Sequence, residues 1–236
     1  MWSINFPLMT LDDPITLNKN KLVAEGVERR IYVHPNDPTR LIKIPKIKSD
    51  DHYKRWTFGD LTKRFFPSTR TRSITKQHEE YQRQLRESQQ SAASLPVSLF
   101  YGFAPTNLGT GEIFERVTND SGENAPTLRD VHDQGDFDIN KLNTFVEHLY
   151  SLAICVSDLN PANFVYGYRH TEAGQKSPNK SWVLIDGYGD RFAIPIRTLN
   201  ATTRRYSIDD AFKRSRKLPN LEWNAKERRF QRPTLT

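Results

Sequence analysis

The sequence predicts an α+β fold in two lobes: an N-terminal, five-stranded antiparallel sheet with one helix, then a smaller and mostly helical part. Three observations predict this fold. Short apolar runs separated by turn residues recur within the first 118 positions. Residues 73–90 contain no Gly or Pro, which favours a helix. From residue 138 onward, apolar side chains recur at helical spacing.

The five strands are expected in the first lobe. KLVAEGVERRIYV (21–33) contains two apolar runs either side of Glu25-Gly26, which indicates a pair of strands with a turn near Gly26. The third strand is RLIKIPK (40–46), and the fourth and fifth are PVSLFYGF (96–103) and GEIFERV (111–117), joined by the turn APTNLGTG. The helix at 73–90 therefore follows the third strand.

The second half begins with 119–136, which is rich in Asn, Asp and Gly and predicts a loop. A helix is predicted from the apolar positions Ile139, Leu142, Phe145, Val146, Leu149, Leu152 and Ala153. Two strands (163–168 and 182–188) and a helix near 207–217 follow. We expect an N-lobe over 1–118 with an insertion at 49–72, a reduced C-lobe over 119–200, and a basic helix and tail over 201–236.

Composition predicts a folded cytoplasmic protein. Of the 236 residues, 36% are hydrophobic, which is enough for a core. The single cysteine, Cys155, lies in the apolar run LAICV and predicts a buried thiol in a reducing compartment. The start MWSINFPLMTLDDP lacks the basic region of a signal peptide, and no apolar run is long enough to span a bilayer.

Charge is concentrated near the C-terminus. Residues 201–236 contain ten Lys/Arg and four Asp/Glu, a net charge of +6 within a chain of net charge +7. One interpretation is an anionic partner, such as a phosphorylated substrate, a lipid surface or a nucleic acid, and the alternative is a solvated helical face. The insertion at 49–72 mixes basic and aromatic residues, which suits nucleic acid, sugar or membrane contacts, or a loop packed over the sheet.

The residues that predict chemistry lie in VSDLNPANF (156–164) and VLIDGYGDR (183–191). A hairpin of the two predicted strands would bring Asn163 and Asp186 to the same end. One amide and one carboxylate oxygen suit Mg²⁺, which completes its shell with phosphate and water oxygens. Asp158 would lie beside the metal and orient or deprotonate an acceptor hydroxyl. The alternative is that these polar residues cap turns and strand ends.

DLNPAN (158–163) resembles the catalytic-loop pattern of protein kinases, and IDGYG (185–189) resembles their metal-binding segment. This resemblance implies a protein-kinase-like fold that uses ATP and Mg²⁺. It further implies roles for residues of the first lobe: Lys43 as the phosphate-binding lysine, Glu79 or Glu80 as its partner, Gly26 in the phosphate-covering loop, and Glu115 and Val117 at the adenine-binding hinge, with Lys46 as a weaker alternative to Lys43.

A narrower resemblance rests on four segments: YVHPNDPTRLIKI (32–44), PVSLFYGFAPTNLGTGEIFERV (96–117), DLNPAN, and LIDGYGDRFAIPI (184–196). These look like the YrbL family, a group of small bacterial kinase-like proteins associated by name with the PhoP regulatory network. The resemblance implies a reduced kinase-like fold in a bacterial protein. It does not imply a substrate.

Several positions depart from the kinase pattern. Val156-Ser157 replaces the usual His-Arg, Asn160 replaces a lysine that contacts the transferred phosphate, and Gly187 replaces an aromatic residue. The phosphate-covering loop has one glycine, Gly26. Two hypotheses follow. The first is a phosphotransferase that transfers a phosphoryl or nucleotidyl group to a hydroxyl, with a non-peptide acceptor favoured by the short C-lobe. The second is a pseudokinase that acts as a nucleotide-binding or regulatory module.

Overall fold

The computed structural model describes residues 13–26, 29–46, 68–88, 94–135, 137–171, 173–189, 198–215 and 217–233. The chain divides into two compact units, of which unit 1 is Met1–Ile47 with Tyr101–Phe114 and unit 2 is Lys48–Phe100 with Glu115–Thr236. The helix after the third strand therefore belongs to unit 2, whereas the sequence predicts it in the N-lobe. Most of the predicted insertion, 49–67, lies outside the described residues.

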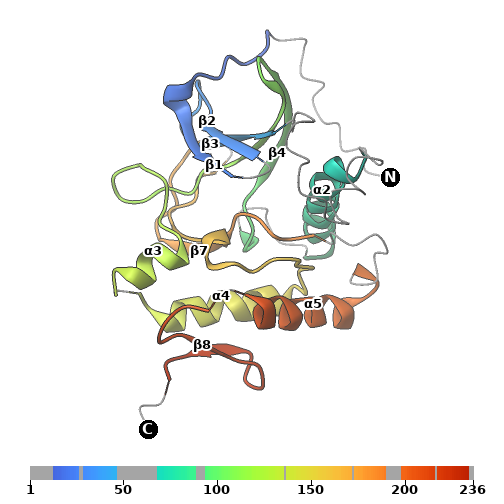
Figure 1. The fold of residues 1–236 in the computed structure, drawn as a ribbon, viewed down its shortest axis with the longest axis vertical. Helices are drawn as coiled ribbons and strands as arrows, with labels where there is room; N and C mark the ends of the chain where they lie inside the picture. Colours follow the sequence, from blue (N-terminus) through green and yellow to red (C-terminus); the bar gives the residue numbers. More distant parts are fainter. Residues whose placement is uncertain are drawn as a thin grey trace, which may run out of the picture. The chain divides into compact units, whose positions relative to one another are not determined.

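The sheet of unit 1 confirms the predicted α+β class with a five-stranded antiparallel sheet. Its strands are β1 (Leu22–Glu25), β2 (Arg29–Val33), β3 (Arg40–Pro45), β4 (Phe100–Thr106) and β5 (Gly109–Glu115), in the spatial order β1-β2-β3-β5-β4 (Figure 1). A 3-10 helix, η1 (Lys19–Lys21), precedes β1.

The two faces of this sheet differ in chemistry. Tyr32 pairs with Ile42 across β2 and β3, and both belong with Ile44 to a core cluster of buried residues. Because side chains alternate along a strand, Lys43 lies on the opposite face, where it pairs with Ile31. One face is therefore apolar, and the other carries a buried lysine.

The turn between β4 and β5 is shorter than predicted, so both predicted strand boundaries are wrong. β4 continues to Thr106, and β5 begins at Gly109. The Thr106 hydroxyl donates to the Gly109 carbonyl (2.6 Å) and accepts from the Leu108 N–H (3.1 Å), which closes the turn. A Cβ at Gly111 would lie 2.5 Å from Cγ2 of Ile42, so glycine permits the close packing of β5 on the core.

Unit 2 contains most of the helices. Its elements are α2 (Ser68–Ser88), α3 (Leu128–Asp133), α4 (Ile139–Ser151), the 3-10 helix η4 (Pro161–Asn163), α5 (Ala201–Arg214), and the hairpins β6 (Phe164–Gly167) with β7 (Ser181–Leu184) and β8 (Glu222–Asn224) with β9 (Arg229–Gln231). The predicted helix after Asp138 is α4, and the Asp138 carboxylate caps it by accepting from the N–H groups of Asn140 and Lys141. No helix in the described ranges is long and apolar enough to cross a membrane.

Two helix boundaries differ from the prediction because of capping. α5 begins before the predicted 207–217, since Asn200 and Thr203 form a capping box at its N-terminus. α3 lies in the segment predicted to be a loop, and Thr127 and Asp130 form its capping box. Both corrections come from short polar patterns that apolar periodicity does not detect.

The β8–β9 hairpin lies in the segment predicted to be a basic tail. It packs beside α4 and α5 (Figure 1). The buried Asn143 on α4 donates from Nδ2 to the Phe230 carbonyl (3.0 Å) and accepts from the Phe230 N–H at Oδ1 (2.7 Å). This side chain therefore pairs with β9 as a neighbouring strand would.

We predict that Asn143→Ala lowers the free energy of unfolding by about 2 kcal/mol, because it leaves backbone groups of Phe230 without their partner. Urea unfolding followed by circular dichroism would measure the change. Glu147→Ala, at an exposed position of the same helix, should change it by less than about 0.5 kcal/mol. Equal effects of the two substitutions would show that the hairpin bond is unimportant.

Candidate functional site

The segment 152–156, which links α4 to Asp158, is held by side chains from α2 and α5. Gln84 donates to the Leu152 carbonyl (3.2 Å), Arg83 and Arg204 donate to the Ala153 carbonyl (both 3.1 Å), Glu80 accepts from the Cys155 N–H (2.7 Å), and Ser207 accepts from the Val156 N–H (3.0 Å). Buried backbone groups that no strand pairs are thus satisfied by side chains. This support fixes the chain as it enters the loop that contains Asp158.

The loop is then joined to the segment that contains Asp186. The Gly187 carbonyl accepts from the N–H groups of Ser157 (2.8 Å) and Asp158 (3.1 Å), and the Cys155 carbonyl accepts from the N–H of Gly189 (2.8 Å). Gly187 has φ +83°, and a Cβ there would lie 1.9 Å from the Asp158 carbonyl oxygen and 3.1 Å from Nδ2 of Asn163. Glycine is required by both the backbone conformation and the close approach.

The β6–β7 hairpin brings Asn163 and Asp186 to one end. Phe164 pairs with Leu184, and the N–H of Ile185 donates to the Asn163 carbonyl (2.9 Å). Nδ2 of Asn163 donates to the Asp158 carbonyl (3.4 Å), and Oδ1 of Asp186 accepts from the Gly187 N–H (2.7 Å). Asp158, Asn163 and Asp186 therefore share one junction, while their catalytic and metal-binding roles stay predictions.

The oxygen atoms at this junction fit an open Mg²⁺ site with few protein ligands better than a metal site that is closed by protein ligands alone. Because Nδ2 of Asn163 donates to a backbone carbonyl, its Oδ1 is the amide end left to act as an oxygen ligand beside the Asp186 carboxylate. Mg²⁺ takes few protein ligands and keeps water or phosphate oxygens. Within the described residues there is no group of three or more His, Cys, Asp or Glu that could hold an ion. A Mg²⁺ site with one amide and one carboxylate ligand does not require such a group.

Asn160 has a local structural role. Its side chain accepts from the Ala162 N–H (3.1 Å) as the N-cap of η4, and its carbonyl accepts from the Asn163 N–H (2.8 Å). The Asp158 carboxylate in turn accepts from the Asn160 N–H (3.1 Å). The turn-capping alternative thus describes real bonds of Asp158 and Asn160, and these bonds also fix the path of the loop.

Tyr188 occupies the core beside this junction. It forms a bridge with Val156, and its hydroxyl donates to the Ser98 carbonyl (3.3 Å). Burial raises the pKa of the Tyr188 phenol above its ordinary value, so the group stays neutral. The aromatic side chain of this segment therefore anchors it in unit 2.

Glu79 and Glu80, the alternative partners of Lys43, differ in their surroundings. Glu80 is buried, and its carboxylate accepts from Arg83 (2.9 Å from Nε), from Gln84 (3.1 Å) and from the Cys155 N–H. Glu79 is exposed. The bonds of Glu80 thus support the loop before Asp158, a role that helix spacing alone does not indicate.

In unit 1, Nζ of the buried Lys43 lies 4.0 Å from the centre of the Phe114 ring. Arg29 lies on the same sheet face, because it pairs with Pro45 and strand residues two apart share a face. Nη1 of Arg29 is 3.5 Å from Oε2 of Glu112, and this buried nitrogen has no hydrogen-bond partner within the described residues. Arg29 is not among the site residues predicted from the sequence. The alternation of side chains along the two predicted paired strands could have placed it on the same face as Lys43.

The structure also describes the surroundings of the other residues predicted to contact the nucleotide, which are Gly26, Glu115 and Val117. The Gly26 N–H donates to the Arg29 carbonyl (2.9 Å), next to residues 27–28, which lie outside the described ranges. The Glu115 carboxylate is buried and paired with Arg169 (2.7 and 2.9 Å). Val117 is part of a core cluster, and its carbonyl accepts from the Ala125 N–H (3.0 Å). Their roles in adenine and phosphate binding stay predictions.

Some of the basic side chains of the C-terminal segment, residues 201–236, make contacts inside unit 2. Four of its arginines bond within unit 2: Arg204 to the Ala153 carbonyl, Arg205 to the Tyr150 carbonyl (3.0 Å), Arg214 to Asp210 (3.0 Å), and Arg228 to Asp209 (2.9 Å). These bonds place α5 and the hairpin in the fold of unit 2. An anionic partner for this segment stays a prediction that concerns its other basic residues.

We predict that Gly187→Ala strongly destabilises unit 2, by more than about 3 kcal/mol, because the new Cβ collides with the Asp158 carbonyl in addition to adopting a strained φ. Gly122→Ala is the matched control, since Gly122 has φ +79° and nothing lies within 4 Å of its added Cβ. That control should lose only about 1–2 kcal/mol. Denaturant unfolding of both variants measures the difference, and equal losses would contradict the close approach.

The chain is similar to the crystal structure of the PF14_0431 kinase domain, with 15% identity, a TM-score of 0.40, and coverage of 70% of this chain and 48% of that chain. It is also similar to Rio2 kinase from Chaetomium thermophilum, solved as an ADP/Mg²⁺-phosphoaspartate complex, with 15% identity, a TM-score of 0.44, and coverage of 86% and 58%. The chain spans about half the length of these structures. Neither likeness decides what this chain binds.

Sequence comparison identifies the family. No curated protein matches the chain. A family model described as PhoP regulatory network protein YrbL matches residues 15–219, most of the sequence and both units. The chain therefore belongs to the YrbL family of PhoP regulatory network proteins.

Proposed function

We propose that the protein is an ATP- and Mg²⁺-dependent phosphotransferase that acts on a hydroxyl acceptor, for which we favour a non-peptide molecule. The observation that carries this proposal is the junction at Gly187, where Asp158 and Asn163 meet the segment of Asp186. Asp158 would orient or deprotonate the acceptor hydroxyl. Asn163 and Asp186 would hold Mg²⁺, which when bound neutralises charge on phosphate oxygens.

Unit 1 would contact the phosphates of the nucleotide through Lys43 and Arg29. The buried Nη1 of Arg29 faces the Glu112 carboxylate at 3.5 Å but makes no hydrogen bond in the described chain, so this nitrogen has a donor left for an anionic ligand. A second cation would also supply phosphate contacts that a covering loop with the single glycine Gly26 lacks.

Of the two candidate partners of Lys43, we favour Glu79. The Glu80 carboxylate already accepts bonds from Arg83, Gln84 and the Cys155 N–H, all within unit 2. Breaking these bonds would leave a buried arginine and a backbone N–H to be satisfied elsewhere. For the adenine ring we retain the backbone of Glu115 and Val117.

A second candidate function is a pseudokinase, a nucleotide-binding or regulatory module without turnover. The bonds of Asn160 favour it. The side chain that stands where kinases commonly use a phosphate-contacting lysine is an amide, and it caps η4 by accepting from the Ala162 N–H. An amide engaged in that way supplies no positive charge for phosphoryl transfer.

We predict that wild-type protein binds ATP in calorimetry with Mg²⁺ and at least about tenfold more weakly without it. Asp186→Ala should abolish the dependence on Mg²⁺, because it removes the carboxylate ligand. Lys43→Ala should weaken binding with and without the metal, because it removes a phosphate contact. ATP turnover would separate the enzyme from the pseudokinase. No ATP binding by folded wild-type protein, or full Mg²⁺ dependence in Asp186→Ala, would overturn the proposal.

We predict that Arg29→Ala weakens ATP binding about tenfold while it changes adenosine binding less than about twofold, because Arg29 would contact phosphates only. Arg30→Ala is the matched control, because Arg30 is exposed, lies on the opposite face of β2, and forms an ion pair with Glu25 at 3.1 Å. Calorimetry with ATP and with adenosine measures both. Equal losses for the two ligands, or for the two variants, would contradict the assignment.

A further inference from the structure

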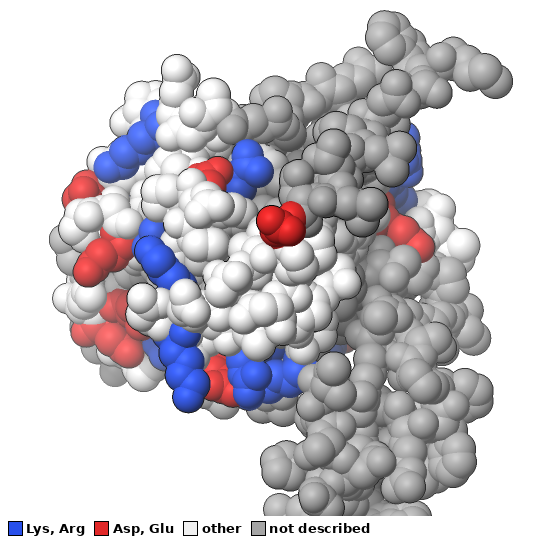
Figure 2. All heavy atoms as spheres, turned by 90° about the horizontal axis from the view of Figure 1, so that it is seen from above, with Lys and Arg blue, Asp and Glu red and all other residues white. Residues whose placement is uncertain are grey.

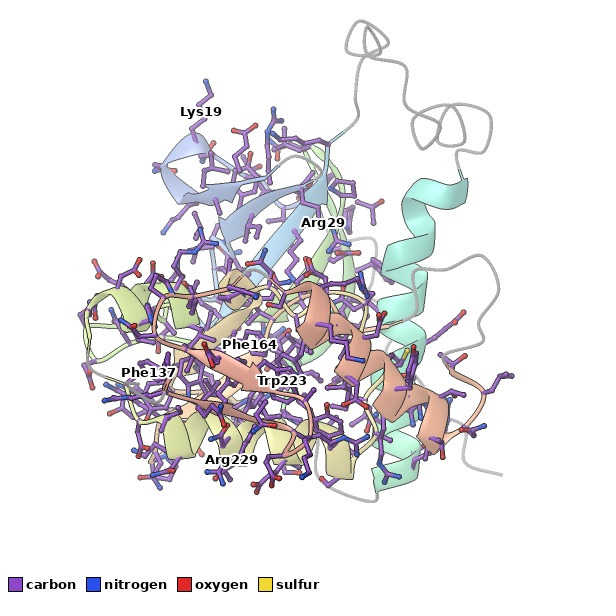
Figure 3. All side chains as sticks on the ribbon, turned by 60° about the horizontal axis from the view of Figure 1, so that its bottom comes forward. Lys19, Arg29, Phe137, Phe164, Trp223 and Arg229 are labelled. Carbon is purple, nitrogen blue, oxygen red and sulfur yellow. The ribbon has the colours of Figure 1, made fainter. Side chains whose placement is uncertain are left out.

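Unit 2 contains a cavity of about 510 Å³ whose lining includes Leu159 and Pro161, from the loop between Asp158 and Asn163. Its walls are mainly apolar and aromatic. The lining includes Leu159, Pro161, Phe164, Phe212, Trp223 and Phe230. Phe164 and Trp223 are labelled in Figure 3. A volume of several hundred Å³ with a few polar groups at its edge is typical of small-molecule sites.

The cavity has fixed walls. Phe212 stacks on Trp223 with ring centres 4.1 Å apart, and Phe230 meets Trp223 edge to face at 5.3 Å. Phe230 is held by Asn143, and the Ser215 hydroxyl donates to the Leu159 carbonyl (2.7 Å). The cavity therefore lies between elements that are bonded to one another.

The charge at the edge of the cavity favours an anion. Lys213 and Lys217 line it and are exposed, and Glu222 is the single acidic residue in the lining. Neither lysine has an ion-pair or hydrogen-bond partner in the part of the chain that the structure describes. They differ in this respect from Arg214 and Arg228, whose charges are paired. The amines are therefore available to a ligand.

Trp223 also contributes a polar group, its indole N–H, to the argument for a ligand. Its Nε1 is buried and has no hydrogen-bond partner within the described residues. Buried indole N–H groups usually have an acceptor. A ligand with acceptor oxygens that enters beside Trp223 would offer one, so the polar and apolar features of the cavity favour the same class of molecule.

We propose that this cavity binds a small organic anion that has a flat, apolar body and a carboxylate, sulfonate or phosphate group. The body would pack against Phe212 and Trp223, and the anionic group would contact Lys213 and Lys217. On the face drawn in Figure 2, basic and acidic residues lie interspersed. The site is distinct from the proposed phosphotransfer residues, and its existence does not depend on them.

The test uses the full chain and 8-anilinonaphthalene-1-sulfonate, an aromatic molecule with one sulfonate, titrated by fluorescence and by calorimetry. We expect a single saturable site. Lys213→Gln with Lys217→Gln should weaken binding about tenfold. Lys226→Gln should leave it unchanged, because Lys226 is an exposed lysine of the β8–β9 hairpin that does not line the cavity. A cooperative thermal transition in each variant shows that the folded state is being measured.

A neutral analogue, N-phenyl-1-naphthylamine, separates the anionic contact from the apolar one. Its affinity should change less than about twofold in the Lys213/Lys217 double variant. Leu218→Trp, which fills the lining, should weaken both probes. Unsaturable binding of the sulfonate by folded wild-type protein, or equal affinity in the double variant and the Lys226 control, would overturn the proposal, whatever the outcome of the ATP titrations.

Discussion

The close contact between Gly187 and Asp158 is the constraint on which the rest of this site depends. Two chain segments far apart in sequence meet there with no room for a side chain, and the Gly187 carbonyl accepts from two successive N–H groups. The contact fixes the backbone at Asp158 and therefore the direction in which its side chain leaves the backbone. It also brings the Asn163 amide and the Asp186 segment to the same place. A loop held by such bonds is pre-organised, which is what positioned catalytic groups require.

The constraint is maintained from behind by side chains of α2 and α5. Glu80 and Ser207 accept from the backbone of the linking segment, and Arg83 and Arg204 donate to it. α2 is therefore a structural support of the Asp158 loop. Glu80, one of the two residues predicted as alternative partners of Lys43, stabilises the loop, because its buried carboxylate accepts from three donors.

Sequence reasoning succeeded where the signal is local. Apolar patterning predicted α4 and the β6–β7 hairpin, and that hairpin in turn predicted that Asn163 and Asp186 lie at the same end. It failed where tertiary partners decide. The β8–β9 hairpin forms because Asn143 and Phe212 supply its missing neighbours, and nothing in EWN or RFQ alone specifies them. The missed helix α3 and the missed start of α5 are a different case, since both capping boxes were visible in the sequence.

Two departures from the kinase pattern acquire physical reasons in this fold. An aromatic residue could not occupy position 187, because even a Cβ there would lie 1.9 Å from the Asp158 carbonyl oxygen. The aromatic side chain comes one residue later, as Tyr188, which is buried and bonded to Ser98. Asn160 caps the turn that leads into Asn163. Both substitutions therefore serve the geometry of the loop, while the positive charge that a lysine would supply at position 160 is absent. Because one side chain accounts for both effects, ATP turnover and not the motif has to separate the enzyme from the pseudokinase.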